Sequence, residues 1–316
     1  MSVVGDEKKH DRWWLRFAGV TSLFLILSVH PIQAEENRPM KEVKMGYSSK
    51  LFSDVDIRDA QVAMELLTAE MNRTIAGGKF FPKCTIYQDT ISMTEAINRQ
   101  EIDMITLPTV DYLRMKNKLQ LEPFFTSANH VDDGQQRLLI VRKDRGITKI
   151  AQLKDKIVNT PSSLKDEISS MWLDILLARE GIREKGNFLR QVKEVNKASQ
   201  AVLPVFFKQT DSAIVTRSAF ELISVLNPQL KEDLSILTSS KSFLGGVFFI
   251  HKNLDESIKR LLVEKITKLN ESPTGKQIYT LLQVDRIIPF QPSYLDNLIE
   301  LEREYRQFSE TLAKRR

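Results

Sequence analysis

The sequence predicts an α/β protein made of two lobes, each a doubly wound, mostly parallel sheet, with helices at the C-terminal end. One module occurs twice, over residues 94–109 and 198–218. In each copy a short amphipathic helix leads into a polar pair, an Asp, a strand of buried type and a polar turn, as in a parallel sheet. The chain also opens with alternating strand and helix patterns, and its 316 residues suit two domains of ordinary size.

The opening segment predicts the first lobe. Residues 42–47 alternate in polarity and predict a strand. Apolar residues then recur at helical spacing over 57–71, with Asp54 or Asp56 as the N-cap and Gly77-Gly78 as the stop. The pattern continues with a strand at 84–87, a helix at 94–99 and a strand at 103–107. This β-α-β-α-β order is typical of a doubly wound sheet.

The middle of the chain repeats the alternation and predicts the second lobe. A strand over 138–142 leaves the first lobe. The elements expected after it are a short helix and a strand within 150–158, a long helix opened by 160–163 and ended by Gly181, and strands at 188–192 and 211–215. Strands expected at 234–237 and 247–250 carry the chain back toward the first lobe. We therefore expect lobe 1 over 35–137 plus 240–316, lobe 2 over 138–239, and hinges near 126–138 and 239–247.

The remainder is mostly helical, with amphipathic stretches at 254–269, 273–282 and 294–312. The last stretch is rich in Glu and Arg at i, i+4 spacing, which is typical of a solvated surface helix. We expect it to pack on lobe 1, and recognition of a partner is the alternative.

Residues 1–34 predict a secretory signal peptide. Basic residues precede an apolar run over 17–29, which is shorter than the roughly 20 residues that span a bilayer. Ile32-Gln33-Ala34 forms an acceptable cleavage site. An uncleaved anchor extended by Trp13 and Trp14 is the alternative. Either way, we expect the rest of the chain in the periplasm.

Composition excludes several function classes. The net charge of +5 is mild, and no basic run carries the interleaved aromatic residues of a nucleic-acid surface. Cys84 is the only cysteine, so the chain has no internal disulfide and no Cys-x-x-Cys metal motif. The four histidines form no close pair, and His130 with Asp132 and Asp133 is more typical of a solvated loop than of a metal site. We expect no catalytic residue, metal or cofactor.

Several stretches resemble a known family. They are IVRKDRGI at 140–147, AQLKDK at 151–156, NTPSS at 159–163, DMITLPTVDY at 103–112 and DSA at 211–213. The chain resembles the substrate-binding proteins of ABC transporters with the two-lobe type II periplasmic-binding fold. More narrowly, it is similar to the phosphate/phosphite/phosphonate-binding family, over roughly residues 40–290. The resemblance implies a monomer that binds a small anion between its lobes.

Three positions depart from the family pattern. The loop that opens the second-lobe helix tends to read Ser-Ser-x-Ser-Gly in the family, but here Lys165 and Asp166 replace the third Ser and the Gly. Ala198 stands where the family often has a His. A phosphonate or phosphate ligand is therefore implied by kinship and is not secured by these residues.

In the second lobe, Ser162 and Ser163 lie where a strand turns into a helix, and free N–H groups with the helix dipole favour an anion there. Lys165 would add a positive charge. A plain N-cap at Ser163 is the alternative. Thr216 and Arg217 follow the last strand of this lobe, where Arg could grip a phosphonate or carboxylate or could simply lie on the surface.

In the first lobe, Tyr47 and Ser48 follow the first strand, and Thr109 and Tyr112 follow the third. Such tyrosines can wall a cleft and donate one hydrogen bond, or they can pack in the core. Asp111 could meet an amino group of the ligand or cap a helix.

We therefore expect an exported solute-binding protein that delivers a small phosphonate-, phosphite- or phosphate-like anion to an ABC permease. One alternative is a ligand-sensing partner of a membrane histidine kinase, and another is a binder of a carboxylate, sulfonate or apolar ligand. An enzyme on the same fold would need a nucleophile or an acid–base pair in the cleft, and the sequence offers neither.

Overall fold

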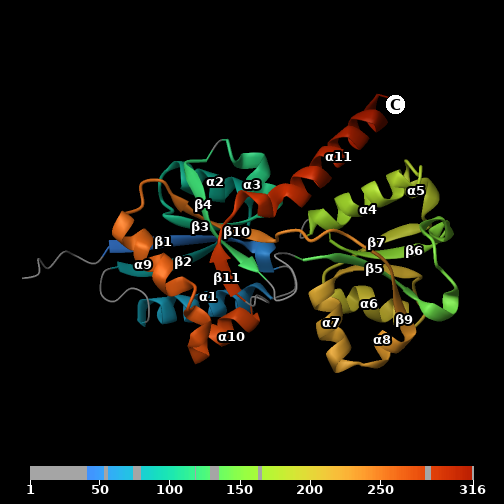
Figure 1. Ribbon diagram of the computed structural model, residues 1–316, viewed down its shortest axis with the longest axis horizontal. Coiled ribbons are helices and arrows are strands. Elements are labelled where there is room, and N and C mark those ends of the chain that lie inside the picture. Colours follow the sequence, from blue (N-terminus) through green and yellow to red (C-terminus); the bar gives the residue numbers. More distant parts are fainter. Residues whose placement is uncertain are drawn as a thin grey trace, which may run out of the picture. The chain divides into compact units, whose positions relative to one another are not determined.

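The computed structural model of the protein describes residues 41–52, 56–73, 80–117, 119–128, 135–162, 166–281 and 286–314 (Figure 1). The expected signal peptide, the glycine pair at 77–78, the loop at His130, Ser163 and Lys165 all lie outside these ranges. Within them, no helix combines the length and the apolar character needed to cross a bilayer.

The first of two sheets has six strands in the order β11-β4-β10-β3-β1-β2. They are β1 (Lys41–Ser48), β2 (Phe80–Tyr87), β3 (Met104–Pro108), β4 (Leu121–Ala128), β10 (Gly246–His251) and β11 (Arg286–Pro289). β1 pairs in parallel with β2 and β3, whereas β10 runs antiparallel to β3 and β4. The return of the chain at β10 confirms the expected strand at 247–250.

Strands β4 and β11 were not predicted from the sequence. β4 contains Pro123, and the register between β4 and β10 shifts next to it, between Phe248 and Phe249. A proline is tolerated in a sheet at such an irregularity, but it interrupts the sequence pattern of a strand. β11 is only four residues long and pairs with β4 alone.

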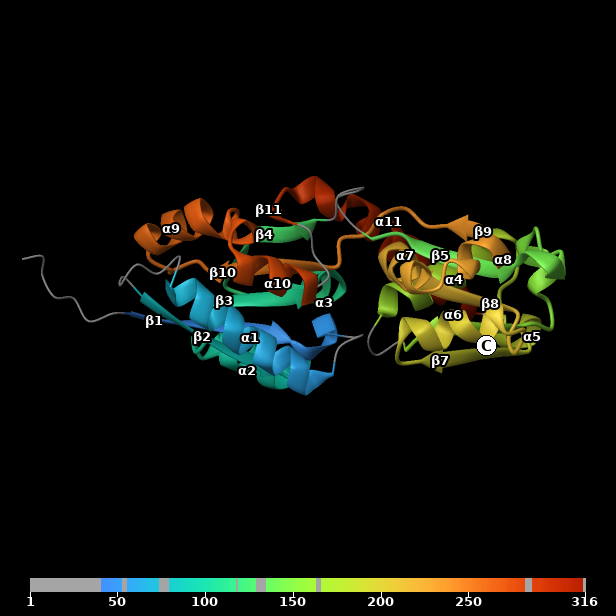
Figure 2. The same cartoon turned by 90° about the horizontal axis from the view of Figure 1, so that it is seen from below.

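Helices cover both faces of the first sheet (Figures 1 and 2). They are α1 (Ile57–Met71), α2 (Thr90–Asn98), α3 (Thr109–Met115), α9 (Glu256–Ile266) and α10 (Pro273–Leu281), with 3-10 turns η1 (Ser49–Phe52), η5 (Leu269–Glu271) and η6 (Pro292–Leu295). α1 confirms the predicted helix, and Asp56 is its N-cap, accepting from the Arg58 N–H at 2.8 Å. α1, α9 and α10 pack on one face, and α2 and α3 on the other.

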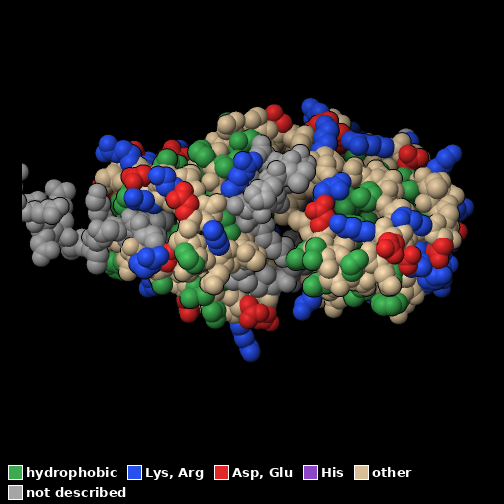
Figure 3. Space-filling view, turned by 60° about the horizontal axis from the view of Figure 1, so that its bottom comes forward, with side chains coloured by type: hydrophobic (Ala, Val, Ile, Leu, Met, Phe, Trp, Pro, Cys, Tyr) green, Lys and Arg blue, Asp and Glu red, His purple; other side chains and the backbone are tan. Residues whose placement is uncertain are grey.

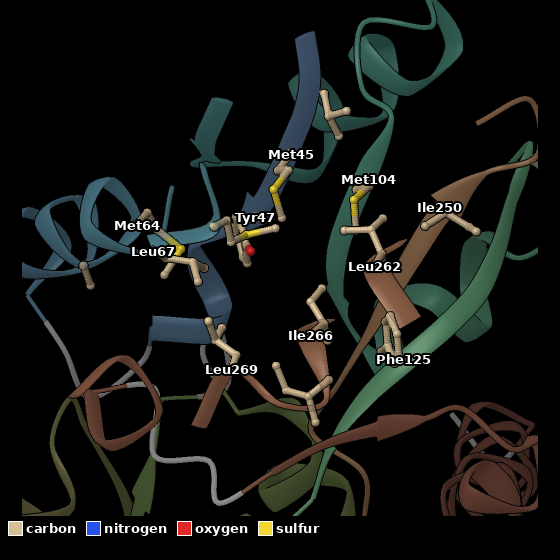
Figure 4. Packing of buried hydrophobic residues seen from close by; sticks show 14 of the residues in the cluster. Met45, Tyr47, Met64, Leu67, Met104, Phe125, Ile250, Leu262, Ile266 and Leu269 are labelled. Atoms are coloured by element: carbon tan, nitrogen blue, oxygen red, sulfur yellow. The ribbon is translucent and has the colours of Figure 1, made fainter. Parts of the chain in front are cut away.

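Alternation along the strands divides the core between these faces. Val43, Met45 and Tyr47 of β1 pack with α1 and α9, as Figure 4 shows for the last two residues. Ile105 and Leu107 of β3 join α2 in a separate buried cluster. Side chains that alternate along a strand thus pack in two separate clusters, one on each face, as expected of a sheet buried on both faces.

The second sheet has five strands in the order β7-β6-β8-β5-β9. They are β5 (Arg137–Arg142), β6 (Ile157–Pro161), β7 (Gln191–Val195), β8 (Ser212–Thr216) and β9 (Leu234–Ser239). β6 is parallel to β7 and β8, and β5 is antiparallel to β8 and β9. The sheet is therefore mostly parallel, with one reversed strand.

The second sheet is also covered on both faces. Its helices are α4 (Glu167–Arg179), α5 (Lys185–Phe188), α6 (Ala198–Phe206), α7 (Arg217–Leu226) and α8 (Gln229–Asp233), with 3-10 turns η3 (Lys143–Arg145) and η4 (Ile150–Leu153). Leu139 and Val141 of β5 pack with α4, whereas Leu138 and Ile140 pack with α6, α7 and α8.

Two expected boundaries in this part of the chain were wrong. The long helix begins at Glu167, not at 160–163, because Asp166 is the N-cap and accepts from the Ser169 N–H at 3.2 Å. The strand expected at 188–192 is β7, at 191–195. Leu189 lies in the turn before this edge strand, and its side chain is buried. A buried apolar residue at this point of the sequence has the pattern of a strand residue, so the predicted strand began too early.

The last helix, α11 (Asp296–Ala313), contacts more than one core. Leu295, just before it, is buried with α2 and β3, whereas Leu298 and Leu301 are buried with Trp172 of α4. The sequence pattern predicts that this helix packs on lobe 1. Its apolar stripe is instead shared with a helix of the second sheet.

Candidate functional site

The predicted site residues that the structure describes lie at or next to the carboxyl edges of the two sheets. In the first sheet, the parallel strands β1, β2 and β3 end at Ser48, Tyr87 and Pro108. In the second sheet, β6 and β8 end at Pro161 and Thr216. Ligands of open α/β sheets bind beyond such edges, at the points where strand order reverses.

At the first edge, Tyr47 and Thr109 are buried. Burial raises the pKa of the Tyr47 phenol well above its usual value, and the charge of a Cys84 thiolate would raise it further. The Tyr47 ring lies in the apolar cluster of Figure 4, 6.4 Å from the ring of Phe52. The Thr109 Oγ1 donates to the Leu244 carbonyl at 2.5 Å. These are the contacts of packing residues, the alternative that the sequence left open.

Ser48 and Tyr112 complete the predicted set at the first edge. Ser48 is buried at the end of β1. Tyr112 is half-buried in α3, and its ring stacks on Phe249 with the centroids 4.4 Å apart. Burial raises the pKa of its phenol, so the hydroxyl is a neutral hydrogen-bonding group at physiological pH.

The carboxylate of Asp111 has an internal partner at this edge. The Lys50 Nζ donates to both of its oxygens, at 3.0 and 2.9 Å. Asp111 is not the N-cap of α3, since Pro108 holds that position. Lys50 was missed because it lies in a 3-10 turn after β1, and no sequence spacing relates it to α3.

At the second edge, Ser162 and Thr216 make hydrogen bonds with the backbone of a neighbouring strand, a loop and a helix. The Ser162 N–H donates to the Val195 carbonyl at 2.9 Å, and the Ser162 carbonyl accepts from the Asp166 N–H at 2.9 Å. The Thr216 hydroxyl caps α7 by accepting from the Ala219 N–H at 3.3 Å. Both residues are half-buried.

Arg217 is oriented by Gln136, which the sequence analysis missed. The Arg217 Nε donates to the Gln136 Oε1 at 2.7 Å, and the Arg217 N–H donates to the Gln136 carbonyl at 2.9 Å. Glu221 lies 3.9 Å away on the same helix. The Arg217 side chain is 33% exposed, so part of the guanidinium is accessible to an anion.

Arg137 and Asp166 form an ion pair beside these residues. The Arg137 Nη2 lies 2.9 Å from the Asp166 Oδ1, and the two side chains are 7% and 13% exposed. Burial disfavours the charged carboxylate, but the charge of Arg137 and hydrogen bonds from Arg137 and Ser169 hold the pKa of Asp166 below its usual value. The pair could not be read from the sequence, because its members lie on β5 and at the start of α4.

Charged groups elsewhere are mixed in sign. Figure 3 shows Lys and Arg side chains interspersed with Asp and Glu on the face it presents. Within the described ranges, no cluster of three or more His, Cys, Asp and Glu side chains could hold a metal ion. His251 is buried at the end of β10, and its Nδ1 accepts from the Asn253 N–H at 3.2 Å.

Comparison with solved structures relates the fold to two-lobe type II periplasmic binding proteins. A binding component of an ABC phosphonate transporter from Pseudomonas aeruginosa superposes with a TM-score of 0.62 at 15% identity, over 85% of this chain and 88% of that one. PhnD1 of Prochlorococcus marinus, in complex with methylphosphonate, gives 0.62 at 14%, over 84% and 98%. The aliphatic sulphonate-binding protein SsuA of Escherichia coli gives 0.54 at 12%, over 86% and 88%.

Sequence comparison defines the family more closely than these distant structures do. No curated protein sequence matches the chain. Residues 54–295, however, match the family model described as an ABC transporter phosphonate periplasmic substrate-binding protein. That match includes Thr109 and Tyr112 at the first edge and Ser162, Thr216 and Arg217 at the second, and it begins after Tyr47 and Ser48. The chain therefore belongs to the family of periplasmic substrate-binding proteins of phosphonate ABC transporters.

Proposed function

We propose that this protein captures a small phosphonate or a related phosphorus oxyanion in the periplasm and delivers it to an ABC permease. The family match over residues 54–295 is the observation that carries the proposal. The similarity to a methylphosphonate complex supports the size of the ligand. The proposed activity is binding and release, with no bond made or broken.

The proposed ligand lies between lobe 1 (35–137 plus 240–316) and lobe 2 (138–239). Ser162, Thr216 and Arg217 are the proposed contacts from lobe 2, because hydroxyl and guanidinium donors suit the oxygens of a phosphonate. Ser163 and Lys165 belong to the same proposal. From lobe 1 we propose that Tyr112 lines the ligand site and donates one hydrogen bond. The buried residues Tyr47, Ser48 and Thr109 are proposed to complete this edge of the site by packing beneath its surface.

Closure of the lobes around the ligand would give the permease a surface that the open protein lacks. We propose that the protein acts as a monomer and reaches the periplasm through a signal peptide in residues 1–34. A sensing role with a membrane histidine kinase uses the same binding event. Adjacent permease or kinase genes would separate the two roles.

A different ligand class has one observation in its favour. The E. coli sulphonate-binding protein shares the fold, and the departures at Lys165, Asp166 and Ala198 alter the family's loop and histidine positions. A sulfonate or carboxylate is therefore the second candidate ligand for the same site.

Thermal unfolding of residues 35–316 against phosphonates, phosphite, phosphate, sulfonates and carboxylates tests the proposal. A ligand at a hundred times its dissociation constant stabilises the protein by about 2.7 kcal/mol. We expect that stabilisation with a phosphonate. Stabilisation by sulfonates or carboxylates alone would establish the second candidate, and no stabilisation by any of these anions would refute the proposal.

The double variant Ser162→Ala/Arg217→Ala tests the site, and we expect it to abolish the stabilisation by the anion. Arg99→Ala is the matched control, because Arg99 is exposed at the end of α2, next to the start of β3 rather than its carboxyl edge. Unchanged affinity in the double variant would show that the anion binds elsewhere.

A further inference from the structure

The N-terminus of α4 is occupied by a carboxylate of the protein itself. One Asp166 oxygen accepts from the Ser169 N–H at 3.2 Å and from the Arg137 guanidinium at 2.9 Å. The other oxygen accepts from the Ser169 hydroxyl at 2.6 Å. An N–H group of the first turn, a hydroxyl and a guanidinium thus converge on one anionic group.

These are the donors that would otherwise receive an anion from outside. A helix N-terminus attracts negative charge through its free N–H groups and its dipole, and a guanidinium binds oxyanions directly. Asp166 and Arg137 are both nearly buried, so an external anion would have to displace the carboxylate to reach the same donors. The described residues therefore contain an anion position that is already filled.

This filled position adjoins the proposed ligand site. The Asp166 N–H donates to the Ser162 carbonyl. Gln136, which orients Arg217, directly precedes Arg137, which holds Asp166. A ligand oxyanion bound by Ser162 and Arg217 would consequently lie beside a guanidinium and a helix N–H group whose positive charge Asp166 already neutralises.

We propose that Asp166 determines the charge of the ligand, favouring monoanionic over dianionic forms of a tetrahedral oxyanion. The inference rests on the proposed function, since it concerns the same site. Because Asp166 occupies the Arg137 guanidinium and the Ser169 N–H, these donors cannot offset a second negative charge on the ligand, so a dianion gains less than it would at a free site. The neighbouring Glu167 is paired with a different guanidinium, that of Arg114, by two hydrogen bonds of 2.9 and 2.6 Å, so it does not compete with the ligand for Arg137.

Two ligands of the same shape separate charge from size. Methanesulfonate is a monoanion throughout the physiological range, whereas methylphosphonate becomes a dianion at mildly alkaline pH, as a phosphate monoester does. The experiment measures the affinity of each ligand by titration calorimetry at mildly alkaline pH, for the protein purified after export. The ratio of the two affinities is compared between the wild type and its variants.

Asp166→Asn removes the charge and keeps an acceptor for the Ser169 N–H. We expect it to shift the affinity ratio toward methylphosphonate by ~10-fold, the order given by one unit charge at a separation of several ångströms. Asp166→Ser is a second variant, since serine is also a good N-cap and the unpaired Arg137 affects folding in both cases. The control is Glu167→Gln, for which we expect a change within about twofold.

The outcomes separate this inference from the proposed function. If the wild type binds methylphosphonate and the ratio of the two affinities is the same in both Asp166 variants, the inference is wrong and the proposed function stands. If the wild type and the folded variants bind neither anion, the proposed function fails, and the inference fails with it. A variant that binds methylphosphonate when the wild type binds only methanesulfonate supports the inference directly.

Discussion

Asp166 also gives the stability of the protein a defined pH dependence. Its pKa is lower in the folded protein than its value of roughly 3.9 in an unfolded chain. The stabilisation is therefore complete above the unfolded pKa and is lost as the pH falls through the lower, folded pKa. We expect Asp166→Asn to be less stable than the wild type in urea unfolding at neutral pH, and the difference to shrink below about pH 4.

A difference that stays constant from neutral to acidic pH would contradict this interpretation. The appropriate control is Asp59→Asn, because Asp59 is an exposed carboxylate in the first turn of α1, in a different element from Asp166 and Arg137. Its substitution is expected to change the free energy of unfolding by no more than about 0.5 kcal/mol at any pH.

Cys84 is predicted to be chemically inert in the folded protein. Burial raises the pKa of its thiol to about 11, although a hydrogen bond from Thr68 lowers it slightly. Only the thiolate reacts with alkylating agents, so a pKa two units above the usual 9.0 reduces the rate ~100-fold. Iodoacetamide at pH ~8, followed by mass spectrometry, measures this rate against the unfolded protein as control. Equal rates in the two states would show that the thiol is exposed.

At the scale of single residues, the sequence located the strand ends next to the predicted site residues, but it did not identify the partners of those residues. Ser162, Thr216 and Arg217 do follow strands β6 and β8, because the strand pattern locates the carboxyl edge. The partners Gln136 and Arg137 lie on a strand that is distant in sequence. Which distant segments meet depends on strand order, and a local pattern carries no information about that order.

At the scale of elements, the hydrophobic periodicity predicted a helix or strand correctly where one face of the element is apolar and the other is polar. α1 and β1 appeared as expected, since the helix has one buried stripe and the strand alternates. The predicted bounds of β7 were wrong because it is an edge strand with few buried residues. β4 was not predicted because Pro123 interrupts its strand pattern. The start of α4 was missed because Ser162 and Ser163 are also good caps, and only the contacts of Asp166 decide between them.

The apolar stripe of α11 gives a prediction for that element. Leu298 is fully buried with Trp172 of α4, whereas its neighbour Ile299 is 44% exposed. Truncation of a buried leucine removes apolar contacts and leaves a cavity. We expect Leu298→Ala to lower the free energy of unfolding by about 2–5 kcal/mol, measured by urea denaturation.

Ile299→Ala is the matched control for that experiment. It is the next residue of the same helix, about 100° further around the axis and 44% exposed, and we expect a loss of less than about 1 kcal/mol. Equal losses at the two positions would mean that α11 does not pack on α4 through Leu298.

At the scale of the whole molecule, α11 meets elements of both sheets at a group of charged side chains. The Arg114 guanidinium, on α3, binds Glu167 at the start of α4, and its Nε lies 3.9 Å from Glu302 on α11. Glu302 is only 15% exposed. Burial raises the pKa of its carboxyl and Glu167 contributes to the increase, although the charges of Arg114, Arg306 and Lys116 oppose it.

A raised pKa means that the fold disfavours the charged form of Glu302. Stability is therefore lost as the pH rises from the unfolded pKa of roughly 4.3 through the folded value. We expect Glu302→Gln to be more stable than the wild type at neutral pH, because the amide needs no charge in this place. The gain should vanish as the pH falls to about 4, where the wild-type carboxyl is also neutral. Thermal unfolding across this range measures the effect, with the exposed Glu310→Gln on the same helix as control. A loss of stability in Glu302→Gln at neutral pH would instead show that attraction to Arg114 outweighs burial where these three helices meet.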